Sequence, residues 1–85
     1  MIYWNDIQSP KNCFARNGGA DQDLSELGAG FTTDTCKKEC ESHSTCDCIT
    51  FKTTDGSCWL RKSCHIDSCD DQANFQVVTG TKGNI

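Results

Sequence analysis

The segment TTDTCKKECESHSTCDCITFKTTDGSCWL, residues 32 to 60, decides the fold of this 85-residue chain. Its first part predicts a helix over residues 33 to 43, because the side chains at its start can accept hydrogen bonds from the first backbone N–H groups. The residues able to cap the helix are Thr32, Thr33 and Asp34. Cys36 and Cys40 lie four residues apart and therefore share one helix face, which is buried if both sulfurs form disulfides.

The second part of the segment predicts a β-hairpin. Two β-prone runs, residues 46 to 52 and residues 57 to 62, flank the pair Asp55-Gly56. Asp-Gly between such runs is a strong signal for a two-residue turn, because glycine readily adopts the positive φ that this turn requires. The turn position then predicts which side chains lie opposite each other.

Side chains of successive strand residues alternate between the two faces of a hairpin. With a two-residue turn, Lys52 lies opposite Trp59. One face then carries an apolar set that can pack on the helix, namely Ile49, Phe51, Cys58 and Leu60. The other face carries Cys48, Thr50, Lys52, Trp59 and Arg61. Cys58 is therefore within reach of Cys36, whereas Cys48 cannot pair with the helix without breaking the register.

The first third of the chain carries weaker signals. Residues 1 to 20 mix aromatic residues with turn formers, which predicts short strands or loops rather than a helix. The aromatic side chains expected to anchor this part in the core are Tyr3, Trp4 and Phe14. In residues 21 to 31, Leu24 and Leu27 lie three apart before a Gly-Ala-Gly stop, a pattern typical of one helical turn or a tight loop.

The last third is expected to close the sheet. Residues 63 to 71 are loop-like, and residues 73 to 78 alternate with Phe75 and Val77 on one face, which predicts a strand. Residues 80 to 85 are expected to be a frayed tail. No internal repeat divides the chain, so the whole of it is expected to form a single domain.

The cysteine content points to a cross-linked scaffold. The chain has eight cysteines, an even number that allows every thiol to be paired, and only fourteen Leu, Ile, Val and Phe residues. Each disulfide contributes about 2–4 kcal/mol, whereas the whole stability of a small domain is about 5–15 kcal/mol. The predicted fold is therefore a small disulfide-rich α+β domain with one helix on a curved antiparallel sheet. Such disulfides persist in secreted, extracellular proteins or in an oxidising organelle lumen.

Charge and hydropathy argue against several functions. The formal net charge of −4 is unfavourable for nucleic-acid binding, which depends on clustered Lys and Arg. No stretch approaches the roughly 20 apolar residues that a membrane span needs, so direct membrane insertion is not expected. The first residues lack the basic and apolar regions of a signal peptide. We therefore expect a mature segment or an excised domain with an added Met1, which allows for a larger parent protein or complex.

Three short elements of the chain resemble a known family. They are the spacing Cys36-x3-Cys40-x5-Cys46, the run Ile49-Thr50-Phe51 and the run Cys58-Trp59-Leu60. In these elements the chain resembles the PAN/Apple module, which carries a helix with two cysteines, a cysteine leading into an apolar-x-aromatic strand, and a cysteine with an apolar partner on the next strand. The resemblance is specific over residues 32 to 60, weaker over residues 13 to 31 and vague after residue 64. Cys48 is additional to the family's basic pattern.

The resemblance implies how the cysteines pair. PAN/Apple modules have two core disulfides, and Apple members have a further one that ties the two ends of the domain. The disulfide that ties the two ends implies Cys64 or Cys69 as the partner of Cys13. Cys48 then pairs with whichever of Cys64 and Cys69 is left. We favour a disulfide between Cys48 and Cys64. Cys64 directly follows the strand that pairs with the strand of Cys48, so this disulfide needs only a local bend of the chain. The expected pairs are therefore Cys36 with Cys58, Cys40 with Cys46, Cys48 with Cys64, and Cys13 with Cys69.

PAN/Apple modules bind proteins or carbohydrates and do no chemistry of their own. The resemblance therefore implies a non-catalytic binding or adhesion module without a cofactor, with a protein ligand ahead of a glycan. On the outer face of the hairpin, Trp59 and Arg61, with Lys52 opposite Trp59, form an aromatic and basic patch of the kind enriched in contact sites. The alternative for Trp59 is structural: it covers the Cys48 disulfide or packs under the N-terminal segment.

Other kinds of site fit the sequence less well. His43 and His65 with the cysteines lack the spacing of a structural zinc site, and a catalytic thiol such as Cys64 has to be free. The carboxylates that lack the loop pattern of an EF-hand calcium site are Asp21, Asp23, Glu26, Asp70 and Asp71. We expect neither a metal nor enzymatic activity. Other functions that fit are a small structural subunit that stabilises a larger complex in an oxidising lumen, and a secreted inhibitor or toxin-like domain.

Overall fold

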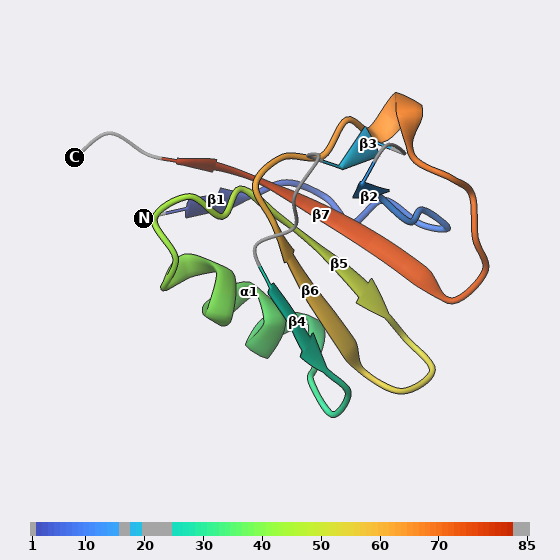
Figure 1. The fold of residues 1–85 in the computed structure, drawn as a ribbon, viewed down its shortest axis with the longest axis horizontal. Helices are drawn as coiled ribbons and strands as arrows, with labels where there is room; N and C mark the ends of the chain where they lie inside the picture. The colour runs from blue at the N-terminus through green and yellow to red at the C-terminus, as the bar shows by residue number, and fades with distance from the viewer. Residues whose placement is uncertain (1, 16–17, 20–24, 83–85) are drawn as a thin grey trace.

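The structure, a computed structural model, describes residues 2–15, 18–19 and 25–82. In this part of the chain, one helix lies against one face of a five-stranded antiparallel sheet, as Figure 1 shows. This arrangement confirms the expected small α+β fold. In spatial order the strands are β1 (Ile2–Trp4), β7 (Phe75–Lys82), β5 (Cys48–Lys52), β6 (Ser57–Arg61) and β4 (Ser25–Gly28). The other elements are helix α1 (Thr33–Glu41), the parallel pair β2 (Phe14–Ala15) and β3 (Gly18–Gly19), and the 3-10 turn η1 (Ile66–Ser68).

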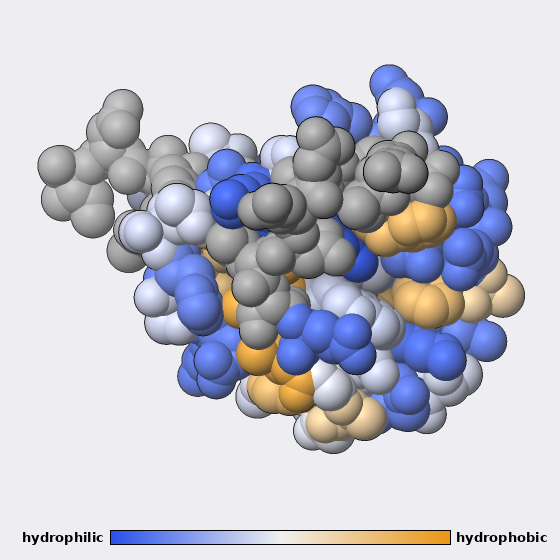
Figure 2. Space-filling model, in the orientation of Figure 1, coloured by the Kyte–Doolittle hydropathy of each residue, from blue (hydrophilic) through white to orange (hydrophobic). Residues whose placement is uncertain are grey.

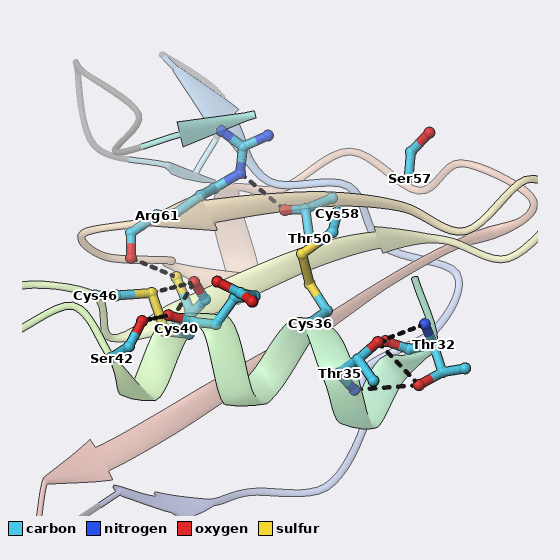
Figure 3. Close-up of a disulfide and its surroundings, with 12 residues drawn as sticks. Thr32, Thr35, Cys36, Cys40, Ser42, Cys46, Thr50, Ser57, Cys58 and Arg61 are labelled. Carbon is cyan, nitrogen blue, oxygen red and sulfur yellow. Dashed lines mark hydrogen bonds between the residues drawn. A yellow bond between two sulfur atoms is a disulfide. The ribbon is translucent and has the colours of Figure 1, made fainter. Parts of the chain in front are cut away.

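Helix α1 begins where the sequence predicts. The Thr32 side chain accepts a hydrogen bond from the Thr35 backbone N–H (3.1 Å), and the Thr32 N–H donates to the Thr35 hydroxyl (2.8 Å), which completes a reciprocal N-terminal cap (Figure 3). The helix ends at Glu41, two residues earlier than expected. Cys36 and Cys40 are fully buried, which confirms the predicted inner face of the helix.

The β5–β6 hairpin has the predicted faces but a different turn. Lys52 lies opposite Ser57 and Ile49 lies opposite Leu60, so residues 53 to 56 form a four-residue loop. The expected two-residue turn, with Lys52 opposite Trp59, is therefore wrong. The register differs from the expected one by two residues, which leaves every strand side chain on its predicted face.

A contact from another part of the chain explains the longer turn. The Phe31 N–H donates to the Gly56 carbonyl (2.9 Å) and the Gly30 N–H donates to the Asp55 carbonyl (3.0 Å), which holds the loop against this segment. Gly56 has a φ of +75°, and a Cβ there would lie 2.5 Å from the Phe31 carbonyl oxygen. Glycine is thus required at the end of the four-residue loop, both for its positive φ and for this close approach.

Strand β4 lies where the sequence predicts a helical turn or tight loop, within residues 21 to 31. It pairs antiparallel with β6, and Glu26 lies opposite Trp59. Leu27 packs against the core cluster on the helix side of the sheet. The expectation is wrong for this strand, because hydrogen bonds to a distant strand outweigh a weak local helical pattern. Leu24 lies outside the described residues.

Strand β7 is longer than expected and joins the N-terminal strand to the centre of the sheet. Its first part pairs with β5, and residues 80 to 82 pair with β1. The expected frayed tail is therefore wrong for these three residues, because β1 provides partners for their backbone groups; residues 83 to 85 lie outside the described chain. In β1, Trp4 packs on the core, whereas Tyr3 is 62% exposed and is not a core anchor. Phe14 is half-buried.

Four disulfides connect the helix, the sheet and the outer segments. The pairs and their Cα distances are Cys36–Cys58 (5.7 Å), Cys40–Cys46 (5.4 Å), Cys48–Cys64 (6.2 Å) and Cys13–Cys69 (4.6 Å). These are the pairs that the resemblance implies, with Cys64 as the partner of Cys48. The first two lie in the core between α1 and the sheet, together with the buried side chains Ile49, Phe51, Leu60 and Val78. Cys13 and Cys69 form a second, smaller cluster with Val77.

Candidate functional site

The candidate site lies on the face of the sheet opposite α1, which we call the outer face. Figure 3 shows the side chains of Thr50, Ser57 and Arg61 on this face, on the other side of the sheet from Cys36 and α1. By strand alternation the outer face also carries Lys52, Trp59, Phe75 and Val77.

Trp59, Phe75 and Lys52 form a compact group on the outer face, the aromatic patch. The Trp59 and Phe75 ring centroids lie 6.0 Å apart with their planes tilted by 32°, within the range of favourable ring contacts. The Lys52 Nζ lies 5.8 Å from the Phe75 ring centroid, a cation–π distance. Phe75 lies directly opposite Lys52 on the neighbouring strand, so the β5–β7 register creates this contact. All three side chains are half-buried, which leaves part of each accessible to a ligand.

Arg61, the third residue of the expected binding patch, lies inside the protein. It is 3% exposed, and its Nε donates a hydrogen bond to the Thr50 hydroxyl (2.8 Å). The Thr50 hydroxyl in turn donates to the Cys13 carbonyl (2.9 Å). The expectation of an accessible Arg61 is therefore wrong, because the chain around Cys13 packs on this end of the outer face. Arg61 stabilises the fold instead, through a charge-assisted hydrogen bond.

Phe75, and not Arg61, is the residue that joins Trp59 and Lys52 in the aromatic patch. The sequence places Phe75 and Val77 on one face of the closing strand, but it does not tell which strand lies next to them. The pairing of β7 with β5 decides this and brings Phe75 to Lys52. The one signal that could have found Phe75 is an aromatic residue at the start of a predicted strand, which is too common to be specific.

Carboxylates border the aromatic patch. Glu26 lies opposite Trp59 in the β4–β6 pairing, so the two side chains share the outer face, and Glu26 is exposed. At the loop end, the Asp55 carboxylate accepts hydrogen bonds from the Ser57 hydroxyl (2.8 Å) and the Ser57 N–H (3.0 Å). These hydrogen bonds, the hydroxyl first, and then the charge of Lys52 lower the pKa of Asp55. Asp55 is therefore negatively charged at neutral pH.

The thiols that other kinds of site would require are all engaged. Each of the eight cysteines is in a disulfide, so none is left for nucleophilic attack or for binding zinc. His43 and His65, the histidines that were weighed against such sites, are exposed. In this structure all eight thiols therefore serve as cross-links.

The carboxylates considered for a calcium site are not brought together. Among the residues that the structure describes, no group of three or more His, Cys, Asp and Glu side chains is placed to hold a metal ion. Asp71 forms an ion pair with Lys11 (2.6 Å), and Glu26 lies on β4 beside Trp59. Of the carboxylates considered for this site, Asp21 and Asp23 lie outside the described part of the chain.

The described residues on the face that Figure 2 shows are mostly hydrophilic. Figure 2 shows, in the orientation of Figure 1, hydrophobic residues gathered in small separate areas between hydrophilic ones. Of the large hydrophobic side chains within the described ranges, Tyr3 and Ile7 are exposed, by 62% and 46%. The described residues include no helix with the length and hydropathy needed to cross a membrane. The described residues visible on this face therefore form no broad apolar area of the kind that is typical of permanent interfaces.

The arrangement of the outer face is suited to binding by contact. The strands β5, β6 and β7 carry the two aromatic rings and the lysine, and carboxylates lie nearby. Disulfides connect β6 to the helix and β5 to an outer segment. Side chains on an ordered backbone lose less conformational entropy when a ligand binds. Searches against family models, curated proteins and solved structures find no match to this chain.

Proposed function

We propose that this protein is a non-catalytic recognition module that binds a protein ligand, ahead of a glycan, through the aromatic patch. The observation that carries the proposal is the contact between Trp59 and Phe75, with 6.0 Å between ring centroids, beside Lys52. Tryptophan and tyrosine, together with arginine, dominate the binding energy of protein interfaces, and aromatic residues in general are enriched there. These two rings are half-buried, so part of each is accessible to a ligand.

The proposal extends to the PAN/Apple type of module. Two observations support it: the helix buries both of its cysteines, and these form the two core disulfides that the resemblance implies, Cys36–Cys58 and Cys40–Cys46. Four disulfides indicate an oxidising environment. Within that environment we propose an extracellular location, as a secreted domain or as part of a larger adhesive protein. The small, separate hydrophobic areas among the described residues on the face that Figure 2 shows favour this proposal over a permanent structural subunit.

The proposal is tested by selecting binders from a random peptide library displayed on phage, with the purified protein as bait. We expect peptides whose affinity falls by about 30-fold or more in Trp59→Ala, the loss typical of a central aromatic contact. Tyr3→Ala is the matched control, because Tyr3 is an exposed aromatic residue outside the aromatic patch. Its affinity for the same peptides should equal that of the wild type.

Two outcomes contradict the proposal. One is the recovery of no binders by a wild-type protein that is folded and monomeric. The other is the recovery of peptides that bind Trp59→Ala as well as the wild type. Amide NMR spectra of each variant verify that the fold is intact, so that a loss of binding is assigned to the missing ring.

A further inference from the structure

We propose that the group recognised by the aromatic patch is a cation: an arginine or lysine side chain of a protein ligand, bound between the Trp59 ring and the Glu26 carboxylate. The inference rests on the proposed function and names its ligand chemistry. It follows from three observations, namely the position of Glu26, a similar arrangement elsewhere in the fold, and the charge of the protein.

The position of Glu26 places a carboxylate beside the indole ring. Glu26 and Trp59 lie opposite each other on β4 and β6, a pairing that puts their Cβ atoms about 4.5–5.5 Å apart on the same face. Phe75 approaches Trp59 from β7, on the other side in the strand order. Glu26 is exposed, and within the described part of the chain its carboxylate makes no hydrogen bond or ion pair. The carboxylate is therefore available to a ligand that touches Trp59.

The helix side of the same fold already contains this combination of groups. There the Lys37 Nζ lies 6.0 Å from the centroid of the Trp4 ring, and the Trp4 indole N–H donates to the Glu41 carboxylate (2.8 Å). One of the protein's own lysines thus lies over a tryptophan ring whose N–H is bonded to a glutamate. Trp59 and Glu26 present the same two groups to the outside, where the cation has to come from a ligand.

Both groups attract the same kind of ligand. The face of a tryptophan ring attracts ammonium and guanidinium groups, and a carboxylate binds guanidinium through two parallel hydrogen bonds. The formal net charge of −4 adds a long-range attraction for basic partners. A neutral glycan would make no use of the Glu26 charge, and an acidic glycan would be repelled by it. The charge of Lys52 lies on β5, on the other side of Trp59 from Glu26 in the strand order, so a basic protein segment fits the charge of the Glu26 side of this surface.

The test uses two short synthetic peptides that differ in one side chain, arginine or citrulline, and follows the Trp59 indole N–H by NMR during titration of the intact protein. Citrulline retains the planar shape of arginine but has no charge. We expect the arginine peptide to bind about fivefold or more tightly than the citrulline peptide. In Glu26→Gln this preference should shrink by about two- to fivefold. Glu39→Gln, an exposed glutamate on α1, is the matched control and should leave the preference unchanged.

The outcomes separate the inference from the proposed function. Equal binding of both peptides at Trp59, or an unchanged preference in Glu26→Gln, overturns the cation inference and leaves the recognition function standing. A shift of the Trp59 signal by chitotriose or by a heparin disaccharide, without one by the arginine peptide, also overturns it in favour of a glycan. If phage selection yields no peptide that depends on Trp59, the proposed function itself fails, and the inference fails with it.

Discussion

The two faces of the sheet are built by different means. On the helix side, apolar side chains fill the space below α1, and both disulfides join residues within the segment 32 to 60. On the outer face, the buried side chain of Arg61 donates a hydrogen bond to the Thr50 hydroxyl. The Cys13–Cys69 disulfide joins residues that are 56 apart in the sequence. The helix side therefore follows from local spacing, whereas the outer face depends on contacts between distant segments.

This difference has an energetic consequence. Apolar packing loses stability gradually as atoms are removed, whereas a buried charged group costs most when a single hydrogen-bond partner is missing. The outer face is thus more sensitive to small polar changes, and the helix side is more sensitive to loss of its cross-link. The expected effects below are ordered from the largest to the smallest.

The largest effect is expected from the disulfides, because each one restricts the unfolded chain. Cys36–Cys58 and Cys48–Cys64 span 22 and 16 residues, so loop entropy alone predicts nearly equal contributions. We expect the double variant Cys36→Ala/Cys58→Ala to lose about 3–5 kcal/mol of unfolding free energy, and Cys48→Ala/Cys64→Ala about 2–3 kcal/mol. The difference arises because the first disulfide is fully buried between helix and sheet, whereas Cys64 is half-buried.

Urea unfolding measures both losses, and far-UV circular dichroism reports whether the helix remains formed. Each double variant leaves no free thiol, so disulfide exchange does not complicate the comparison. Equal losses in the two variants would mean that loop closure alone determines the contribution of these disulfides. The proposed contrast between the two faces would then not apply to their cross-links.

A smaller effect is expected from Thr50→Val, which keeps the side-chain shape but removes the hydroxyl. The Arg61 Nε then loses its acceptor at 2.8 Å, and the Cys13 carbonyl loses a donor at 2.9 Å. We expect a loss of about 1–2 kcal/mol in unfolding free energy, because buried polar atoms lose this hydrogen-bond partner. Thr50→Ser is the control, since it retains the hydroxyl. A Thr50→Val variant as stable as Thr50→Ser would refute the role of this network.

The smallest effect is expected from acid titration of Asp55 in the hairpin loop. Hydrogen bonds from Ser57 lower the pKa of Asp55 below its ordinary value of 3.8, so the ionised form stabilises the folded state above that pH. This stabilisation is lost as the pH falls from about 4 through the lower pKa of the folded protein. We expect the melting temperatures of the wild type and Asp55→Asn to differ slightly near neutral pH and to converge in acid. A difference that is constant with pH would contradict this assignment.

Local spacing was sufficient for the core of the fold. The helix start at Thr33, the shared face of Cys36 and Cys40, and the alternation in the hairpin all depend on residues within a few positions of one another. The turn length was not predictable in this way. It depends on the Phe31 backbone, which reaches the loop at Gly56 from a different part of the chain.

The sequence by itself determined the disulfide-rich α+β class, the buried face of the helix and the faces of the hairpin, because cysteine number and side-chain periodicity express local geometry. Tertiary structure alone decided that β4 and the end of β7 are strands, that Arg61 is buried and that Phe75 lies beside Trp59. Each of these depends on which distant backbone supplies hydrogen bonds and which segment covers a side chain. The candidate site belongs to this second class, because the sequence proposed Trp59 and Lys52, whereas the strand order supplied their neighbours.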